Sequence, residues 1–62
     1  MNNTEKAIVA CFKALVCNYF AMSCALGGNH EGVKRWGAAT DAEMENVKKL
    51  SALKGDENAD QD

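Results

Sequence analysis

The residues whose chemistry could carry a function are three cysteines and a histidine. Cys11, Cys17 and Cys24 are followed by His30, the only histidine in the chain. Zinc sites usually draw their sulfur ligands from close pairs such as C-x2-C. Here the spacings are six, seven and six residues, and the three cysteines fall in one apolar stretch that reads as a helix. Such a helix cannot bring them to one ion, so we expect no metal and no cofactor.

The same cysteines offer little to a disulfide framework or to nucleophilic catalysis. Cys17 and Cys24 would lie about 10 Å apart along a helix, beyond the reach of a disulfide. Free cysteines packed in a helix behave as small apolar residues, which suits a reducing cytoplasm; an intermolecular bridge between two copies is the alternative. Cys24 lies near the C-terminal end of its helix, the wrong end for stabilising a thiolate. We expect a protein that is not an enzyme.

The element that must position these residues is the apolar run 7–26, AIVACFKALVCNYFAMSCAL. Only Lys13, Asn18 and Ser23 interrupt it. Polar residues before the run and two glycines after it predict a helix over about 4–26. In so short a chain this helix must be buried in a copy of itself, in a partner or in lipid.

A second, shorter helix is predicted over about 41–54, after a glycine-punctuated connector over 27–40. Thr40 has the position of an N-cap, and Glu43 completes a capping box with it. The predicted helix is amphipathic, with four apolar residues on one face. These residues are Met44, Val47, Leu50 and Leu53.

Length and composition favour one all-α domain of marginal stability. The chain has 62 residues, no proline and a net charge of −2. A chain of this size buries only about 60% of its unfolded surface and is marginally stable alone, and small scaffolds usually add a disulfide, a metal or association with a partner. We expect a single helical domain over 1–54, followed by an acidic, disordered tail over 55–62, GDENADQD.

Two seams with a heptad rhythm run along the first predicted helix. One carries large side chains at Ile8, Phe12, Leu15, Tyr19, Met22 and Leu26. The other carries small ones at Ala7, Ala10, Ala14, Cys17, Ala21 and Cys24. At 100° per residue the two seams lie on roughly opposite sides of the helix. Because the second helix can cover only one of them, the helical hairpin should be completed by another copy.

The predicted assembly is a homodimer that forms a four-helix bundle. Its self-association residues would include all of the large seam and four members of the small seam, namely Ala10, Ala14, Cys17 and Ala21. Asn18 has two open interpretations. It either hydrogen-bonds across the interface and sets the register, or it reaches solvent at the edge of the seam.

A membrane span over 7–26 is the main rival interpretation. Twenty mostly apolar residues match the thickness of the hydrocarbon layer, about 30 Å. Against a span, Lys13 near its centre costs roughly 2.5–3.5 kcal/mol on insertion scales. We therefore expect a cytoplasmic protein, with a single-span membrane protein as the alternative.

A helix-turn-helix DNA-binding regulator is the second alternative, with a turn at Gly37 of the segment 30–50. Asp41 and Glu43 would then begin the recognition helix and face phosphates, which disfavours nucleic acid as a partner.

The function expected from these observations is a non-enzymatic protein-interaction module that self-associates and binds or inhibits a larger protein. Lys34, Arg35 and Trp36 are the candidate contacts with that target, because tryptophan and arginine dominate binding energies. Trp36 could instead anchor the hairpin itself. By size alone the chain resembles the small accessory proteins of phages and mobile elements.

Overall fold

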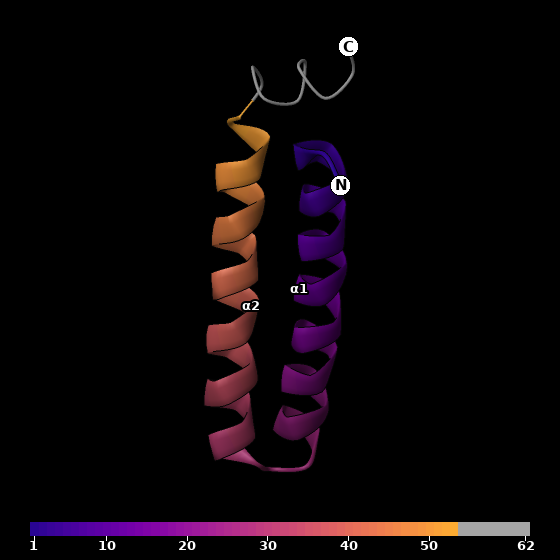
Figure 1. Ribbon diagram of the computed structural model, residues 1–62. Helices are drawn as coiled ribbons and strands as arrows, with labels where there is room; N and C mark the ends of the chain where they lie inside the picture. The colour runs from indigo at the N-terminus through magenta and orange to yellow at the C-terminus, as the bar shows by residue number, and fades with distance from the viewer. Residues whose placement is uncertain (54–62) are drawn as a thin grey trace.

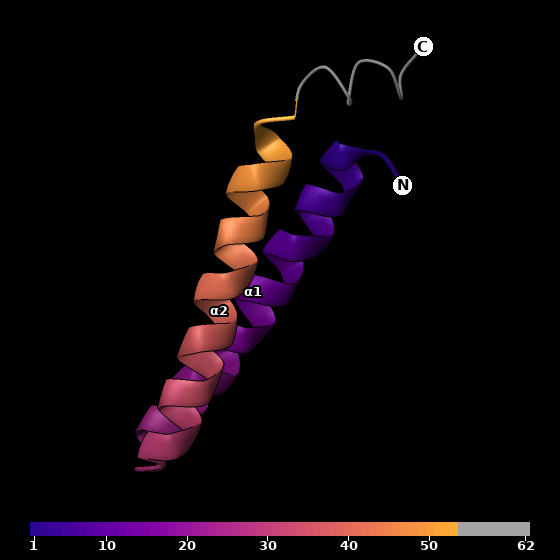
Figure 2. The ribbon, with the colours of Figure 1, turned by 60° about the vertical axis from the view of Figure 1, so that its left-hand side comes forward.

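The protein is a hairpin of two antiparallel helices. The structure is a computed structural model that describes residues 1–53, with α1 at Asn3–Leu26 and α2 at His30–Ser51. The two helices lie side by side along their length and are joined by a short connector at one end (Figure 1). They also lie next to one another in the rotated view of Figure 2. The predicted all-α helical hairpin is confirmed for the described residues.

Local hydrogen bonds set both ends of α1. Asn2 is the N-cap: its Oδ1 accepts the backbone N–H of Glu5 at 2.8 Å, while the Glu5 carboxylate accepts the N–H of Asn2 at 3.0 Å. This reciprocal pair satisfies two donors that the first turn would leave free. The chain leaves the helix after Leu26 through Gly28, whose φ of 76° is the left-handed conformation that favours glycine.

The second helix is longer than predicted. α2 begins at His30, so the expected connector over 27–40 is wrong and only residues 27–29 join the helices. The N-cap is Asn29, whose side-chain oxygen accepts the N–H of Gly32 at 3.0 Å. The helix ends at Ser51 rather than at residue 54. The expected tail over 55–62 lies outside the described residues.

Thr40 does not cap a helix but lies inside one. Its hydroxyl donates to the carbonyl of Trp36 at 2.8 Å, one turn earlier in α2, which is how threonine is accommodated within a helix. Gly37 is also helical. The helix is therefore continuous at Gly37, and the prediction of a turn there, which a helix-turn-helix motif requires, is wrong. Glycine lowers helix propensity by only about 1 kcal/mol, and packing against α1 overrides so small a penalty.

Beside the connector, Gly32 of α2 is buried and lies close to Cys24 of α1. A Cβ at Gly32 would collide with the Sγ of Cys24 and lie 2.9 Å from the Nδ2 of Asn29. Asn29 cannot yield freely, because its side chain caps α2 and also donates to the Cys24 sulfur at 3.9 Å. A side chain at position 32 would therefore have to displace the Cys24 sulfur of α1 or the Asn29 cap.

Substituting the two glycines inside α2 should have opposite effects on stability. We expect Gly32→Ala to lower the free energy of unfolding by about 1 kcal/mol or more, because the new methyl group displaces the Asn29 cap or the Cys24 side chain. Gly37→Ala is the matched control, since nothing lies within 4 Å of its Cβ position. It should raise stability by about 0.5–1 kcal/mol. Urea unfolding followed by circular dichroism measures both, and equal effects would contradict the proposed close approach.

Candidate self-association interface

The small seam of α1 is the side that packs on α2. Ala10 and Ala14 are 5% and 4% exposed and are the only buried apolar residues among those described. The remaining four members of the seam are half-buried: Ala7, Cys17, Ala21 and Cys24. Because these side chains are short, the two helix backbones can approach closely. Ala10, Ala14, Cys17 and Ala21, which we also expected to serve self-association, are thus placed in the contact between α1 and α2.

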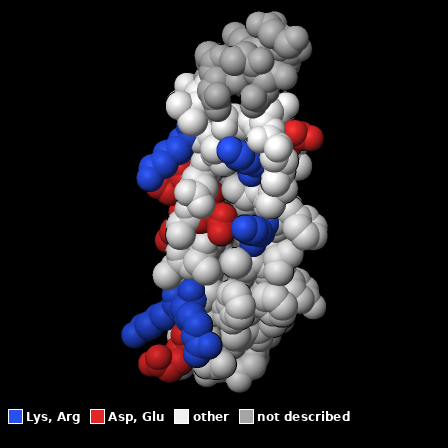
Figure 3. Space-filling model, in the orientation of Figure 1, with Lys and Arg blue, Asp and Glu red and all other residues white. Residues whose placement is uncertain are grey.

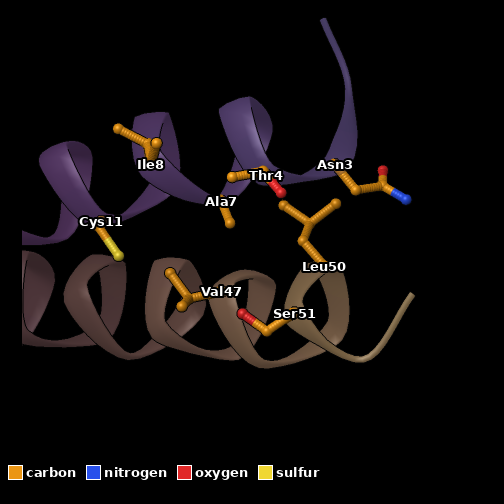
Figure 4. Close-up of a pocket in the computed structure, with 8 residues that line it drawn as sticks. All are labelled: Asn3, Thr4, Ala7, Ile8, Cys11, Val47, Leu50 and Ser51. Carbon is orange, nitrogen blue, oxygen red and sulfur yellow. The ribbon is translucent and has the colours of Figure 1, made fainter. Parts of the chain in front are cut away.

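The large seam is the side that α2 leaves uncovered. Its six side chains are between 59% and 90% exposed: Ile8, Phe12, Leu15, Tyr19, Met22 and Leu26. Figure 4 shows Ile8 directed away from α2, whereas the Cys11 sulfur, one turn further along α1, is directed toward it. A line of large apolar side chains this long is uncommon on the surface of a soluble monomer and is typical of an interaction site.

The charged side chains gather elsewhere. In Figure 3 the Lys, Arg, Asp and Glu residues are concentrated over α2, and the outer edge of α1 beyond its first turn is almost free of charge. On α1, Lys6 and Lys13 lie outside the large seam, in a shallow depression beside Glu43 of α2. The apolar seam is therefore not interrupted by charge between Ile8 and Leu26.

Two apolar grooves between the helices extend the large seam onto α2. The first has eight lining residues (Figure 4): Asn3, Thr4, Ala7, Ile8, Cys11, Val47, Leu50 and Ser51. The second is lined by Cys11, Ala14, Leu15, Asn18, Thr40 and Met44. Cys11 belongs to both grooves, so they follow one another along the same edge of the hairpin. A partner lying on the seam would therefore also meet apolar residues of α2.

The apolar stripe predicted for the second helix is only partly directed at α1. Val47 and Leu50 are half-buried, and in Figure 4 they point toward α1. Met44 is 44% exposed and lines the second groove. Leu53 follows the end of α2 and is 49% exposed.

Asn18 lies at the edge of the large seam. Its side-chain Nδ2 donates to the sulfur of Met22 at 3.7 Å, one turn further along α1. A thioether is a weak acceptor, and the Asn18 side chain is exposed. Asn18 thus borders the surface that a second copy would cover.

The three candidate target contacts are not equivalent in the structure. The Trp36 ring packs on Phe20 of α1 with centroids 5.0 Å apart, and Phe20 in turn makes an edge contact with Tyr19 at 5.8 Å. Trp36 is half-buried by this arrangement, whereas Lys34 and Arg35 are exposed. Trp36 therefore serves the hairpin, and a role of Lys34 and Arg35 in target binding stays a prediction.

The cysteines and the histidine are not brought together. Cys11 is exposed, Cys17 and Cys24 are half-buried, and all three are free thiols. Within residues 1–53, no three His, Cys, Asp or Glu side chains are grouped so that they could hold a metal ion. Cys24 instead faces Gly32 and the Asn29 cap, so its place in the fold is structural.

By length and composition, α1 could also cross a membrane: it has 24 residues, and its most apolar stretch has a mean hydropathy of 1.6. No protein family, curated protein or solved structure matches the chain. The candidate interface therefore rests on its own geometry.

Enlarging a side chain on the small seam should destabilise the hairpin. We expect Ala14→Leu to lower the free energy of unfolding by about 1–3 kcal/mol, because the added atoms force α2 away from α1. Ala42→Leu is the matched control, since Ala42 is exposed on α2, and it should change stability little. Thermal unfolding followed by circular dichroism tests the pair. If the two variants melt together, the small seam is not the packed side.

Proposed function

We propose that this protein is a non-enzymatic interaction module that self-associates through the large seam of α1. One observation carries the proposal: six large apolar side chains in a continuous line are 59–90% exposed, while the buried apolar residues of the described hairpin are two alanines. Two alanines are a negligible core for a chain of this size. The surface that stabilises the fold must therefore come from outside the hairpin.

The magnitude of the burial supports this interpretation. Covering a large apolar side chain stabilises a protein by about 1.5–3 kcal/mol, so the whole seam is worth on the order of 10 kcal/mol before the cost of association. The contact with α2 offers less, because the side of α1 that faces α2 carries the small seam. Folding and association should then occur together, as in obligate dimers whose monomers are not stably folded.

The same seam suggests how the protein would act on a larger one. A helix of the target with a complementary apolar face would compete with the second copy for the large seam of α1. Such exchange of one helix partner for another is a common mode of recognition. The exposed Lys34 and Arg35 would then add contacts near the connector end.

Insertion into a membrane is the second candidate, because α1 is long and apolar enough for a span. The hairpin argues against it. α2 lies along α1 and carries eight charged residues: Glu31, Lys34, Arg35, Asp41, Glu43, Glu45, Lys48 and Lys49. Each charged side chain at the centre of a bilayer costs roughly 2.5–3.5 kcal/mol. A spanning α1 would therefore have to lose α2, so the hairpin supports a cytoplasmic, self-associated protein.

Light scattering after size exclusion, in reducing buffer without detergent, tests self-association directly. We expect a dimer or small oligomer of constant mass. Recovery only in detergent would instead support the membrane span, and a folded monomer would contradict both candidates.

A carboxylate in the middle of the large seam should abolish assembly. We expect Leu15→Glu to convert the oligomer into an unfolded monomer, because a charge at a covered position is not compensated. The measurements are the mass by light scattering and the helical signal by circular dichroism. Ala42→Glu places the same charge on the exposed side of α2, and it should leave both unchanged. A Leu15→Glu variant that keeps the native mass would show that the seam is not the interface.

A further inference from the structure

The large seam is symmetric about its own centre. Its spacing reads 4-3-4-3-4 in both directions, so a twofold axis at the level of Cys17 maps the seam onto itself. Ile8 would then meet Leu26 of the other copy, Phe12 would meet Met22, and Leu15 would meet Tyr19. We propose that the occupant of the seam is a second copy of this chain lying antiparallel to the first, in this register. The inference rests on the proposed self-association and adds its orientation.

Charge favours the antiparallel orientation over the parallel one. Glu5 lies three residues before Ile8 and so continues the seam toward the N-terminus. In a parallel pair the two Glu5 carboxylates would face each other, and like charges at facing positions are destabilising. In the antiparallel pair Glu5 faces the connector end of the other α1. The dipoles of the two helices then point in opposite directions, which is the favourable arrangement.

Asn18 supplies a reason for one register. It lies one residue from the axis, so the two Asn18 side chains of an antiparallel pair come to the same edge of the interface, about 3 Å apart along the helices. Each exchanges its weak contact with the Met22 sulfur for an amide partner. A shift by one heptad would leave these amides covered and without an amide partner, which is unfavourable.

The area of the seam matches what a stable pair requires. With about 200 Å² for a fully exposed large apolar residue, six residues exposed by 59–90% offer about 800 Å² per copy. Each partner of a standard stable interface contributes about this area. Ile8 and Leu15 also line the grooves that lead to Val47 and Met44. A second copy on the seam would therefore reach α2 as well, as a four-helix bundle requires.

A photo-cross-link tests the orientation in the otherwise native chain. Phe12 is replaced by p-benzoylphenylalanine, which inserts into nearby C–H bonds on irradiation. Trypsin cleaves after Lys6 and Lys13, so position 12 falls in peptide 7–13 and Met22 falls in peptide 14–34. We expect a covalent dimer in which peptide 7–13 of one copy is joined to Met22 of the other. The reciprocal replacement of Met22 should join the same two peptides.

The outcomes separate this inference from the function on which it rests. A link between two 7–13 peptides would show a parallel pair and overturn the orientation alone. A dimeric mass from either variant without a covalent dimer would place the interface elsewhere. A native chain that is monomeric or requires detergent would overturn self-association itself. The same photoreactive residue at Ala42 is the control: it should leave the dimeric mass intact and give no covalent dimer.

Discussion

The contact between the small residues of α1 and α2 is the constraint on which the rest of the structure depends. Ala10 and Ala14 let the two helix axes approach, and Gly32 leaves room for Cys24 beside the connector. Because α2 occupies this side, every large apolar side chain of the opposite seam is turned outward. The exposed surface is thus a direct consequence of how the hairpin closes, since a single helix cannot cover both sides of α1.

The two seams of α1 have different roles, because one fixes the position of α2 and the other offers the apolar surface that could stabilise the fold. The small seam determines where α2 lies, through steric fit and the Asn29 cap, but it buries little apolar area. The large seam carries six large apolar side chains that α2 leaves 59–90% exposed. Under the proposed self-association the protein would gain its stability from its partner, and we expect its folded population to follow the concentration of that partner.

Much of the fold could be predicted from the sequence, and the part that failed has a physical cause. The two heptad seams and the glycines after Leu26 identified α1 and its two faces. The sequence does not predict the early start of α2, because Gly32 and Gly37 are typical of breaks in a helix, although Val33 and Trp36 continue the apolar spacing of the helix. Which seam meets α2 could not be predicted from spacing, since both have the same rhythm. The choice of seam depends on the distance between the helix axes, which is known only once the helices are packed.

The three-residue connector has a consequence for how the hairpin forms. Residue pairs in contact are nested around it: Cys24 with Gly32, then Phe20 with Trp36, then Asn3 and Leu50 lining one groove at the far end. Each pair lies outside the one before it, so the contact already made shortens the loop that the next pair must close, and little entropy is lost at each step once the turn exists. The contacts between the helices can therefore form in order from the connector outward, within the microseconds in which local structure forms. By the same ordering, thermal opening starts at the end that holds Asn3 and Leu50.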